Sequence, residues 1–263
     1  MIIRHDVPDA EYRIDRSAFP ALAEMPFHGH GVLIADFWVV TAAHVTAAHA
    51  AFGHPVESVT INDQLRSVAE VVVHPGYKAT PTELTAKALS SGDAGPLEAF
   101  AAEIDDIALI RLAEPVKDAE ASPLYRGADE QGQIVEFMGR GATGTGLQGQ
   151  VTNPLLRSDL RRAYQRVLSA DERWLVFRFD APPEEPPLAG QPSDGDSGGP
   201  ILIVSDGLKR LAGLVSHKET TIDIDIANYH PCAYGSLSYQ TRISRYLAWI
   251  DRVIGATTVE ASS

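Results

Sequence analysis

Short apolar runs alternate with Gly, Pro, Asp and Asn along most of this 263-residue chain. The pattern predicts an all-β core, because runs of about four to eight apolar residues bounded by turn residues are typical of strands. Many short strands with this spacing favour a barrel or a sandwich. The segments that fit the pattern are 31–40, 56–61, 66–73, 107–112, 133–138, 175–179, 200–204 and 211–216.

Three segments predict helices instead: 82–102, 157–168 and 242–254. The first is rich in alanine and contains glycine, so we expect a surface excursion there. In the last, apolar residues recur every three or four positions and form one stripe, which we expect to pack on a barrel. These residues are Ile243, Tyr246, Leu247, Ile250, Val253 and Ile254. Segment 116–125 has the character of a linker between two halves.

Composition and charge narrow the class of protein. The chain is 44% hydrophobic and 22% charged, which is ordinary for a globular protein. No apolar run approaches the roughly 20 residues of a membrane-spanning helix, so we expect no membrane partner. The 22 basic and 35 acidic residues give a net charge of −13, which repels phosphate backbones and disfavours nucleic acid as a partner. Cys232 is the one cysteine and can form no internal disulfide.

A serine stands in a glycine-rich turn, Gly195-Asp-Ser197-Gly-Gly-Pro200. Glycines allow several backbone N–H groups to converge on one point, as an oxyanion hole requires. Upstream, the apolar run Trp38-Val-Val-Thr-Ala-Ala-His44 brings a histidine to the end of a strand, and Asp106 opens another apolar strand. A serine hydroxyl becomes a nucleophile when an imidazole takes its proton, and a carboxylate must orient that imidazole. The three residue types that this chemistry needs are therefore present.

In this order the chain resembles the trypsin/chymotrypsin-like serine proteases. Six ordered motifs carry the resemblance: Gly31-Val-Leu-Ile34, Thr41-Ala-Ala-His44, His74-Pro-Gly-Tyr77, Asp106-Ile-Ala-Leu109, the Gly195 to Pro200 turn and Tyr246-Leu-Ala-Trp-Ile250. The resemblance implies an all-β fold of two packed antiparallel β-barrels, with a catalytic cleft between them and a C-terminal α-helix. It implies a serine endopeptidase that hydrolyses polypeptides through an acyl-enzyme, without a cofactor.

The resemblance also assigns roles along the chain. His44 is expected to be the general base, Asp106 its orienting carboxylate and Ser197 the nucleophile. The N–H groups of Gly195 and Ser197 would form the oxyanion hole, and Asp196 would be a buried acid that stabilises the loop. We expect residues 1–118 to form the barrel half with His44 and Asp106, 119–240 the half with Ser197, and 241–263 the helix and tail.

The base and its carboxylate each have a second candidate nearby in the sequence. Thr-Ala-Ala-His occurs twice, ending at His44 and at His49. His44 directly follows the apolar strand, so we expect His49 to lie at the surface. The pattern of the family it resembles places the orienting carboxylate immediately before Ile-Ala-Leu, which selects Asp106 over Asp105, so we expect Asp105 to face solvent.

The sequence disfavours a catalytic metal site and a dinucleotide-binding site. Nine histidines are present, with His28, His30, His44, His49 and His54 close in sequence, but no His-Glu-x-x-His spacing occurs, so we expect no catalytic metal. The glycines at 139, 141 and 144 match Gly-x-Gly-x-x-Gly. Turn residues follow them instead of a helix, which predicts a loop beside the cleft and no pyrophosphate site.

Substrate specificity is where the chain departs from familiar members of that family. Gln191, six residues before Ser197, takes the place at the base of the primary pocket, so no acid there awaits Lys or Arg. Ser216, His217 and Lys218 resemble the strand that pairs with substrate, but His217 and Lys218 replace an aromatic residue and a glycine. With Ser238 as a polar wall residue, these features favour a small or polar side chain in the pocket.

Active members of the family bury a new N-terminal amine, usually on Ile or Val, against the acid before the nucleophile. Ile2 lies 42 residues before His44, a similar spacing, so we expect Met1 to stand in the way and processing to expose Ile2. No signal peptide is visible in residues 1–30, although the resemblance favours a secreted or periplasmic location. The oligomeric state stays open.

Two other functions are compatible with some of these features. One is a binding module that keeps the protease fold with little or no turnover, as the changes at Gln191, His217 and Lys218 suggest. The other is a serine esterase of the hydrolase-sheet type. Its histidine would come last in the sequence, so the order of residues here argues against it.

Overall fold

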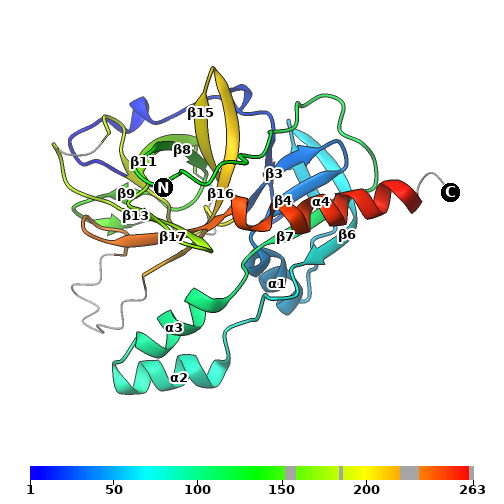
Figure 1. Ribbon diagram of the computed structural model, residues 1–263. Helices are drawn as coiled ribbons and strands as arrows, with labels where there is room; N and C mark the ends of the chain where they lie inside the picture. The colour runs from blue at the N-terminus through cyan, green and yellow to red at the C-terminus, as the bar shows by residue number, and fades with distance from the viewer. Residues whose placement is uncertain (152–157, 184–185, 220–230, 261–263) are drawn as a thin grey trace.

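The computed structural model describes residues 1–151, 158–183, 186–219 and 231–260, with only the backbone for 257–260 (Figure 1). Six antiparallel strands close into a first barrel. In barrel order they are β2 (Leu22–Glu24), β3 (His30–Ala35), β4 (Trp38–Thr41), β7 (Ala108–Leu112), β6 (Gln64–Val73) and β5 (Ser58–Ile61).

The predicted strand 31–40 is a hairpin. β3 and β4 pair with Val32 opposite Val40, and the chain turns between Ala35 and Trp38. β4 is buried at every position because it lies inside the first barrel, between β3 and β7. This continuous burial explains why its sequence is an unbroken apolar run and does not alternate.

The second half is an open seven-stranded antiparallel sheet that curls into a half-barrel. All-β architecture with a C-terminal helix is therefore confirmed, with the first barrel closed and the second open. The strand order is β11 (Arg161–Arg166), β8 (Ile134–Gly139), β15 (Pro200–Ser205), β16 (Leu208–Lys218), β17 (Leu237–Arg242), β13 (Trp174–Arg178) and β12 (Ser169–Ala170).

A small third sheet ties the start of the chain to the second half. In it, β1 (Ile2–Ile3) pairs antiparallel with β14 (Gly190–Gln191) and parallel with β9 (Gly144–Thr145). β10 (Gly149–Gln150) completes the sheet beside β9. Met1 and Ile3 accordingly belong to the apolar core of the second half.

Helices lie outside the two sheets. α1 (Ala43–Ala51) follows β4 directly, and α2 (Thr82–Ser91) and α3 (Gly95–Glu103) project from the barrel as a pair (Figure 1). α4 (Ile243–Glu260) packs Tyr246, Trp249 and Ile250 into the core of the first barrel. The predictions of a helical excursion and of an amphipathic C-terminal helix are thus confirmed. Short 3-10 turns occur at Asp9–Glu11 and Arg16–Ala18.

The predicted helix at 157–168 is wrong. Residue 157 lies outside the described part of the chain, and Arg161–Arg166 forms β11, which pairs with β8. Arg161, Ala163 and Gln165 are buried while their neighbours are more exposed, which is the period of a strand. Because most of these residues are polar, a hydrophobicity pattern could not show the alternation.

The segment between the halves connects both. Ser122 donates its N–H to Leu33 O of the first barrel at 2.8 Å, and Tyr125 donates to Leu211 O of the second sheet at 2.8 Å. The connecting segment is therefore hydrogen-bonded to a strand of each half. Within the described residues, no helix is both long and apolar enough to span a bilayer.

Candidate active site

His44 sits on the first turn of α1, immediately after the buried strand β4. Ala42 at the helix N-cap has no side-chain oxygen, so the free N–H groups of the first turn need another acceptor. Asp106, two residues before β7, supplies it: His44 N donates to Asp106 Oδ1 at 2.8 Å, and His44 Nδ1 lies 2.8 Å from Oδ2. This double contact fixes the imidazole ring in one orientation.

Asp106 is buried and fully engaged, with its side chain 1% exposed. Ser216 Oγ donates to Oδ2 at 2.5 Å, and Thr241 Oγ1 donates to the Asp106 backbone oxygen at 2.9 Å. Burial alone would raise the pKa of Asp106, but attraction to His44 and hydrogen bonds from His44 and Ser216 lower it to about 2. The carboxylate is therefore charged at any physiological pH.

The interaction with Asp106 raises the pKa of His44. Burial disfavours the imidazolium, but the charge of Asp106 and its hydrogen bond outweigh burial, so the pKa of His44 lies above its ordinary value. A positive charge on this ring is thus stabilised by a permanent negative partner.

Ser197 lies in the loop between β14 and β15. Among the described residues, the N–H groups of Gly195 and Ser197 have no acceptor, whereas those of their neighbours are bonded: Asp196 N to Ser193 O at 3.0 Å and Gly198 N to Val215 O at 2.7 Å. Two unpaired donors on either side of Asp196 are what an oxyanion hole needs.

The serine loop packs directly on the first barrel. His30 N donates to Ser197 O at 2.7 Å, and Gly198 has φ of 74°. A Cβ at Gly198 would lie 2.2 Å from His30 O, so only glycine fits this close approach. The loop of the second half is therefore held against the half that carries His44.

These contacts bring His44, Asp106 and Ser197 to one cleft of about 470 Å³ between the two halves. Ser216, His217, Lys218 and Ser238 line the same cleft, as do Leu97 and Ala101 of α3. In the described structure no hydrogen bond joins the His44 ring to the Ser197 hydroxyl, and such contacts commonly tighten when substrate binds.

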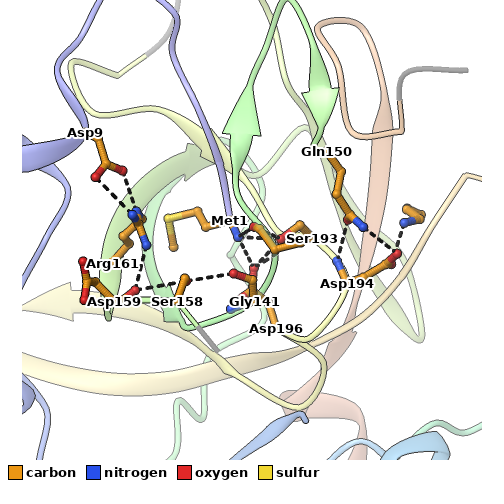
Figure 2. A network of polar contacts seen from close by, with 12 residues as sticks. Met1, Asp9, Gly141, Gln150, Ser158, Asp159, Arg161, Ser193, Asp194 and Asp196 are labelled. Carbon is orange, nitrogen blue, oxygen red and sulfur yellow. Dashed lines mark hydrogen bonds and ion pairs between the residues drawn. The ribbon is translucent and has the colours of Figure 1, made fainter. Parts of the chain in front are cut away.

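Asp196 is held by the start of the chain (Figure 2). The Met1 ammonium lies 2.9 Å from Asp196 Oδ2, and both groups are 1% exposed. It also donates to Ala142 O and Ser193 Oγ, while Gly141 N donates to Asp196 Oδ1 at 2.8 Å. Burial would raise the pKa of Asp196, but the ammonium lowers it. The expectation that Met1 blocks this contact is wrong, because its own amine occupies the seat and Ile2 is paired in β1.

The glycines of the 139–144 motif make room for that carboxylate. A Cβ at Gly139 would lie 2.0 Å from Asp196 Oδ1, and one at Gly141 would lie 2.7 Å from it. No helix follows them, since the chain continues into the short strand β9. The motif therefore encloses Asp196.

Gln191 does not line the cleft. It is fully buried in β14 opposite Ile2, and its Nε2 donates to Ser236 O at 3.3 Å. Four small buried residues line the cleft together with Lys218: Ser193, Val215, Ser216 and Ser238.

His217 behaves as an aromatic residue. Its ring stacks on Tyr239 with centroids 4.9 Å apart and contacts Trp174 edge-on at 4.7 Å. Burial lowers its pKa to about 4, so the ring is neutral at physiological pH. The side chain thus supplies the flat apolar surface expected of the residue it replaces.

Two predicted surface residues are not at the surface. His49 is 3% exposed, because its ring stacks on Phe27 at 5.4 Å. The Asp105 side chain is 13% exposed, accepts a hydrogen bond from Tyr246 at 2.9 Å and pairs with Arg173 at 3.2 Å. Both expectations failed because the partners come from distant segments. Asp105 anchors α4, and neither residue enters the cleft.

The sequence did not point to three other residues around the site. Ser193 touches both Asp196 and the Met1 ammonium, Thr241 supports Asp106, and Asp194 pairs with Lys218. The closeness of Ser193 and Asp194 to Ser197 was the available signal. Within the described segments, no group of metal-ligating side chains could hold a metal ion.

Comparison with known proteins agrees with this architecture. The family described as Trypsin matches residues 11–250, which is most of the chain. The complement C1s subcomponent of Bos taurus is 29% identical over 111 residues, covering 40% of this chain and 14% of C1s. The similarity thus spans only a small part of that relative's length. The chain belongs to the trypsin family of serine proteases.

Proposed function

We propose that this protein is a serine endopeptidase. The observation that carries the proposal is the placement of His44, paired with the buried Asp106, in the same cleft as Ser197 and the two unpaired N–H groups beside it. In functional terms, residues 1–118 would supply the base and its carboxylate, residues 119–240 the nucleophile, and residues 241–263 a docking helix and tail.

In the proposed acylation step, Ser197 Oγ attacks the carbonyl carbon of the scissile bond as His44 takes the hydroxyl proton. Asp106 keeps the imidazole in the required tautomer and stabilises the charge it gains. The N–H groups of Gly195 and Ser197 donate to the oxygen of the tetrahedral intermediate. His44 then gives the proton to the leaving amine, the C–N bond breaks, and an acyl-enzyme remains.

Deacylation repeats these roles with water. His44 takes a proton from the water that attacks the acyl-enzyme, and the second tetrahedral intermediate collapses with the proton returned to Ser197 Oγ. The proposed chemistry uses only residues of the chain and water. Ser216 would pair with the substrate backbone while also supporting Asp106.

The proposed substrate is a polypeptide without Lys or Arg before the scissile bond. Among the described residues that line the cleft, the small buried ones are Ser193, Val215, Ser216 and Ser238, which offer no carboxylate to a basic side chain, while Asp106 and Asp194 are already paired with His44 and Lys218. Incubating a peptide library with the protein and sequencing the new termini tests this. We expect cleavage without enrichment of Lys or Arg before the cut. Dominant cleavage after Arg would contradict the specificity, and no new termini would contradict the function.

The pH dependence follows from the His44 and Asp106 pair. The base must be neutral, so activity falls as the pH drops through the pKa of His44. Because that pKa is raised, we expect the midpoint of the fall at a pH above the ordinary imidazole value of about 6.5. Asp106, with its pKa of about 2, adds no further inflection near neutrality. A profile of kcat/KM against pH checks this, and a midpoint well below 6 would contradict it.

A further inference from the structure

One ion pair lies within the cleft that contains Ser197. Lys218, the last residue of β16, reaches Asp194 Oδ1 with its Nζ at 2.6 Å. Asp194 belongs to the serine loop, three residues before Ser197, and both members of the pair line the cleft. The contact therefore links strand β16 to the serine loop within the second half. We call it the cross-cleft pair.

Asp194 is fixed from its far side as well. Gln150 Nε2 donates to Asp194 Oδ2 at 3.0 Å, and Asp194 N donates to Gln150 Oε1 at 3.1 Å (Figure 2). Gln150 is itself in β10, part of the small sheet that includes β1. The Asp194 carboxylate is 48% exposed, but its hydrogen bonds with Gln150 hold it in place as the acceptor of the Lys218 ammonium.

The part of the cleft near this pair is lined by small side chains. Ser193, Val215, Ser216 and Ser238 are each less than 9% exposed, and none is large enough to exclude a bulky substrate group. Lys218 lies opposite Ser238 in the pairing of β16 with β17 and follows Ser216 by two residues. Its side chain is 28% exposed and extends to Asp194. A long lysine side chain therefore lies beside these small lining residues.

We propose that the cross-cleft pair determines specificity by restricting the primary pocket to small, uncharged side chains. This inference rests on the proposed peptidase function and names its substrate class. A small side chain fits beneath the pair without disturbing it. A large one must displace Lys218 from Asp194, and a charged one must compete with one member of the pair.

The test uses a series of peptides that differ only in the residue before the scissile bond: Ala, Ser, Leu, Phe, Glu and Arg. The readout is the ratio of kcat/KM for Leu and Phe to that for Ala, measured for the wild type, Lys218→Ala and Asp194→Ala. We expect the ratio to rise at least about tenfold in Lys218→Ala, the lower end of the effect of one methylene group in an apolar pocket. A smaller rise is expected in Asp194→Ala, where Lys218 remains but loses its anchor.

Lys117→Ala is the matched control, because Lys117 forms an ion pair with Asp36 at the surface, outside the cleft. Its ratio should equal that of the wild type. An unchanged ratio in Lys218→Ala would overturn the proposal. So would a wild-type preference for Glu that Lys218→Ala removes, because Lys218 would then bind the substrate directly.

A binding measurement separates this proposal from the function on which it rests. In a Ser197→Ala background, calorimetry compares the Kd of peptides that end in Ala or Phe, with Lys218 present or replaced by Ala. A Phe-to-Ala preference that grows about tenfold without Lys218 supports the proposal even if the wild type has no turnover. Equal preferences in the two backgrounds would refute it, whatever the activity.

Discussion

Ser197→Ala and His44→Ala should each lower kcat/KM for peptide hydrolysis by about 10⁴ to 10⁶. The first removes the nucleophile and the second removes the group that accepts its proton, so neither variant can form an acyl-enzyme efficiently. Because the two residues act in one step, the double variant should be no worse than either single variant. Initial rates at pH 8, normalised to folded protein, provide the measurement.

His54→Ala is the matched control for the histidine variant. His54 is exposed, lies shortly after α1, and makes a ring contact with Phe27 outside the cleft. It should retain activity within a few-fold of the wild type. Losses of equal size in His44→Ala and His54→Ala would contradict the assignment of the base, as would a Ser197→Ala protein with normal turnover.

The second large effect concerns the buried ion pair between the Met1 ammonium and Asp196. Asp196→Ala leaves a buried charge without its partner, and breaking a buried ion pair in this way typically costs about 3 to 5 kcal/mol. If that cost falls on the serine loop, the fraction of molecules with a formed oxyanion hole drops by about 150- to 4,000-fold. Adding one glycine before Met1 should act similarly, because it moves the ammonium away from Asp196.

We therefore expect the chain beginning at Met1 to acylate fastest, the glycine-extended chain more slowly, and Asp196→Ala slowest. A chain beginning at Ile2 should also be slower, since Ile2 is committed to β1 and lies opposite Gln191. Asp6→Asn, which removes a surface pair with Arg4, serves as the control and should match the parent chain. A glycine-extended chain that acylates at the parent rate would show that Asp196 is satisfied in another way.

Local sequence patterns were sufficient for much of this fold. The apolar run before His44 forms β4, the run after Asp106 forms β7, and the stripe of Tyr246 and Ile250 packs as predicted. In the two strands a continuous apolar run records burial on both faces, and in the helix the periodicity records which side is buried. The helix α1 after β4 was not predicted. The serine turn could also be located from the sequence, because its close packing on the first barrel requires glycine at 198.

The failures involve partners that lie far away in the sequence. Arg161–Arg166 becomes a strand because β8 offers a free edge, and its polar residues gave no apolar alternation. Asp105 is drawn inward by Tyr246 and Arg173, and Asp194 is held in place at the surface of the cleft by Gln150 and Lys218. Periodicity cannot indicate such contacts, since each is set by how the two halves pack. The resemblance to serine proteases located the cleft, but the residues that shape its pocket came from the structure.

The central claim is that Ser197 is an activated nucleophile, and a fluorophosphonate probe tests it most directly. The probe reacts with a serine whose hydroxyl proton is removed as it attacks phosphorus and fluoride leaves. Intact-mass and peptide mass spectrometry should then find one adduct, on Ser197, and its rate of formation should fall at least about 10³-fold in His44→Ala. A folded protein that forms no adduct on Ser197 under conditions that label a control serine protease would contradict the account.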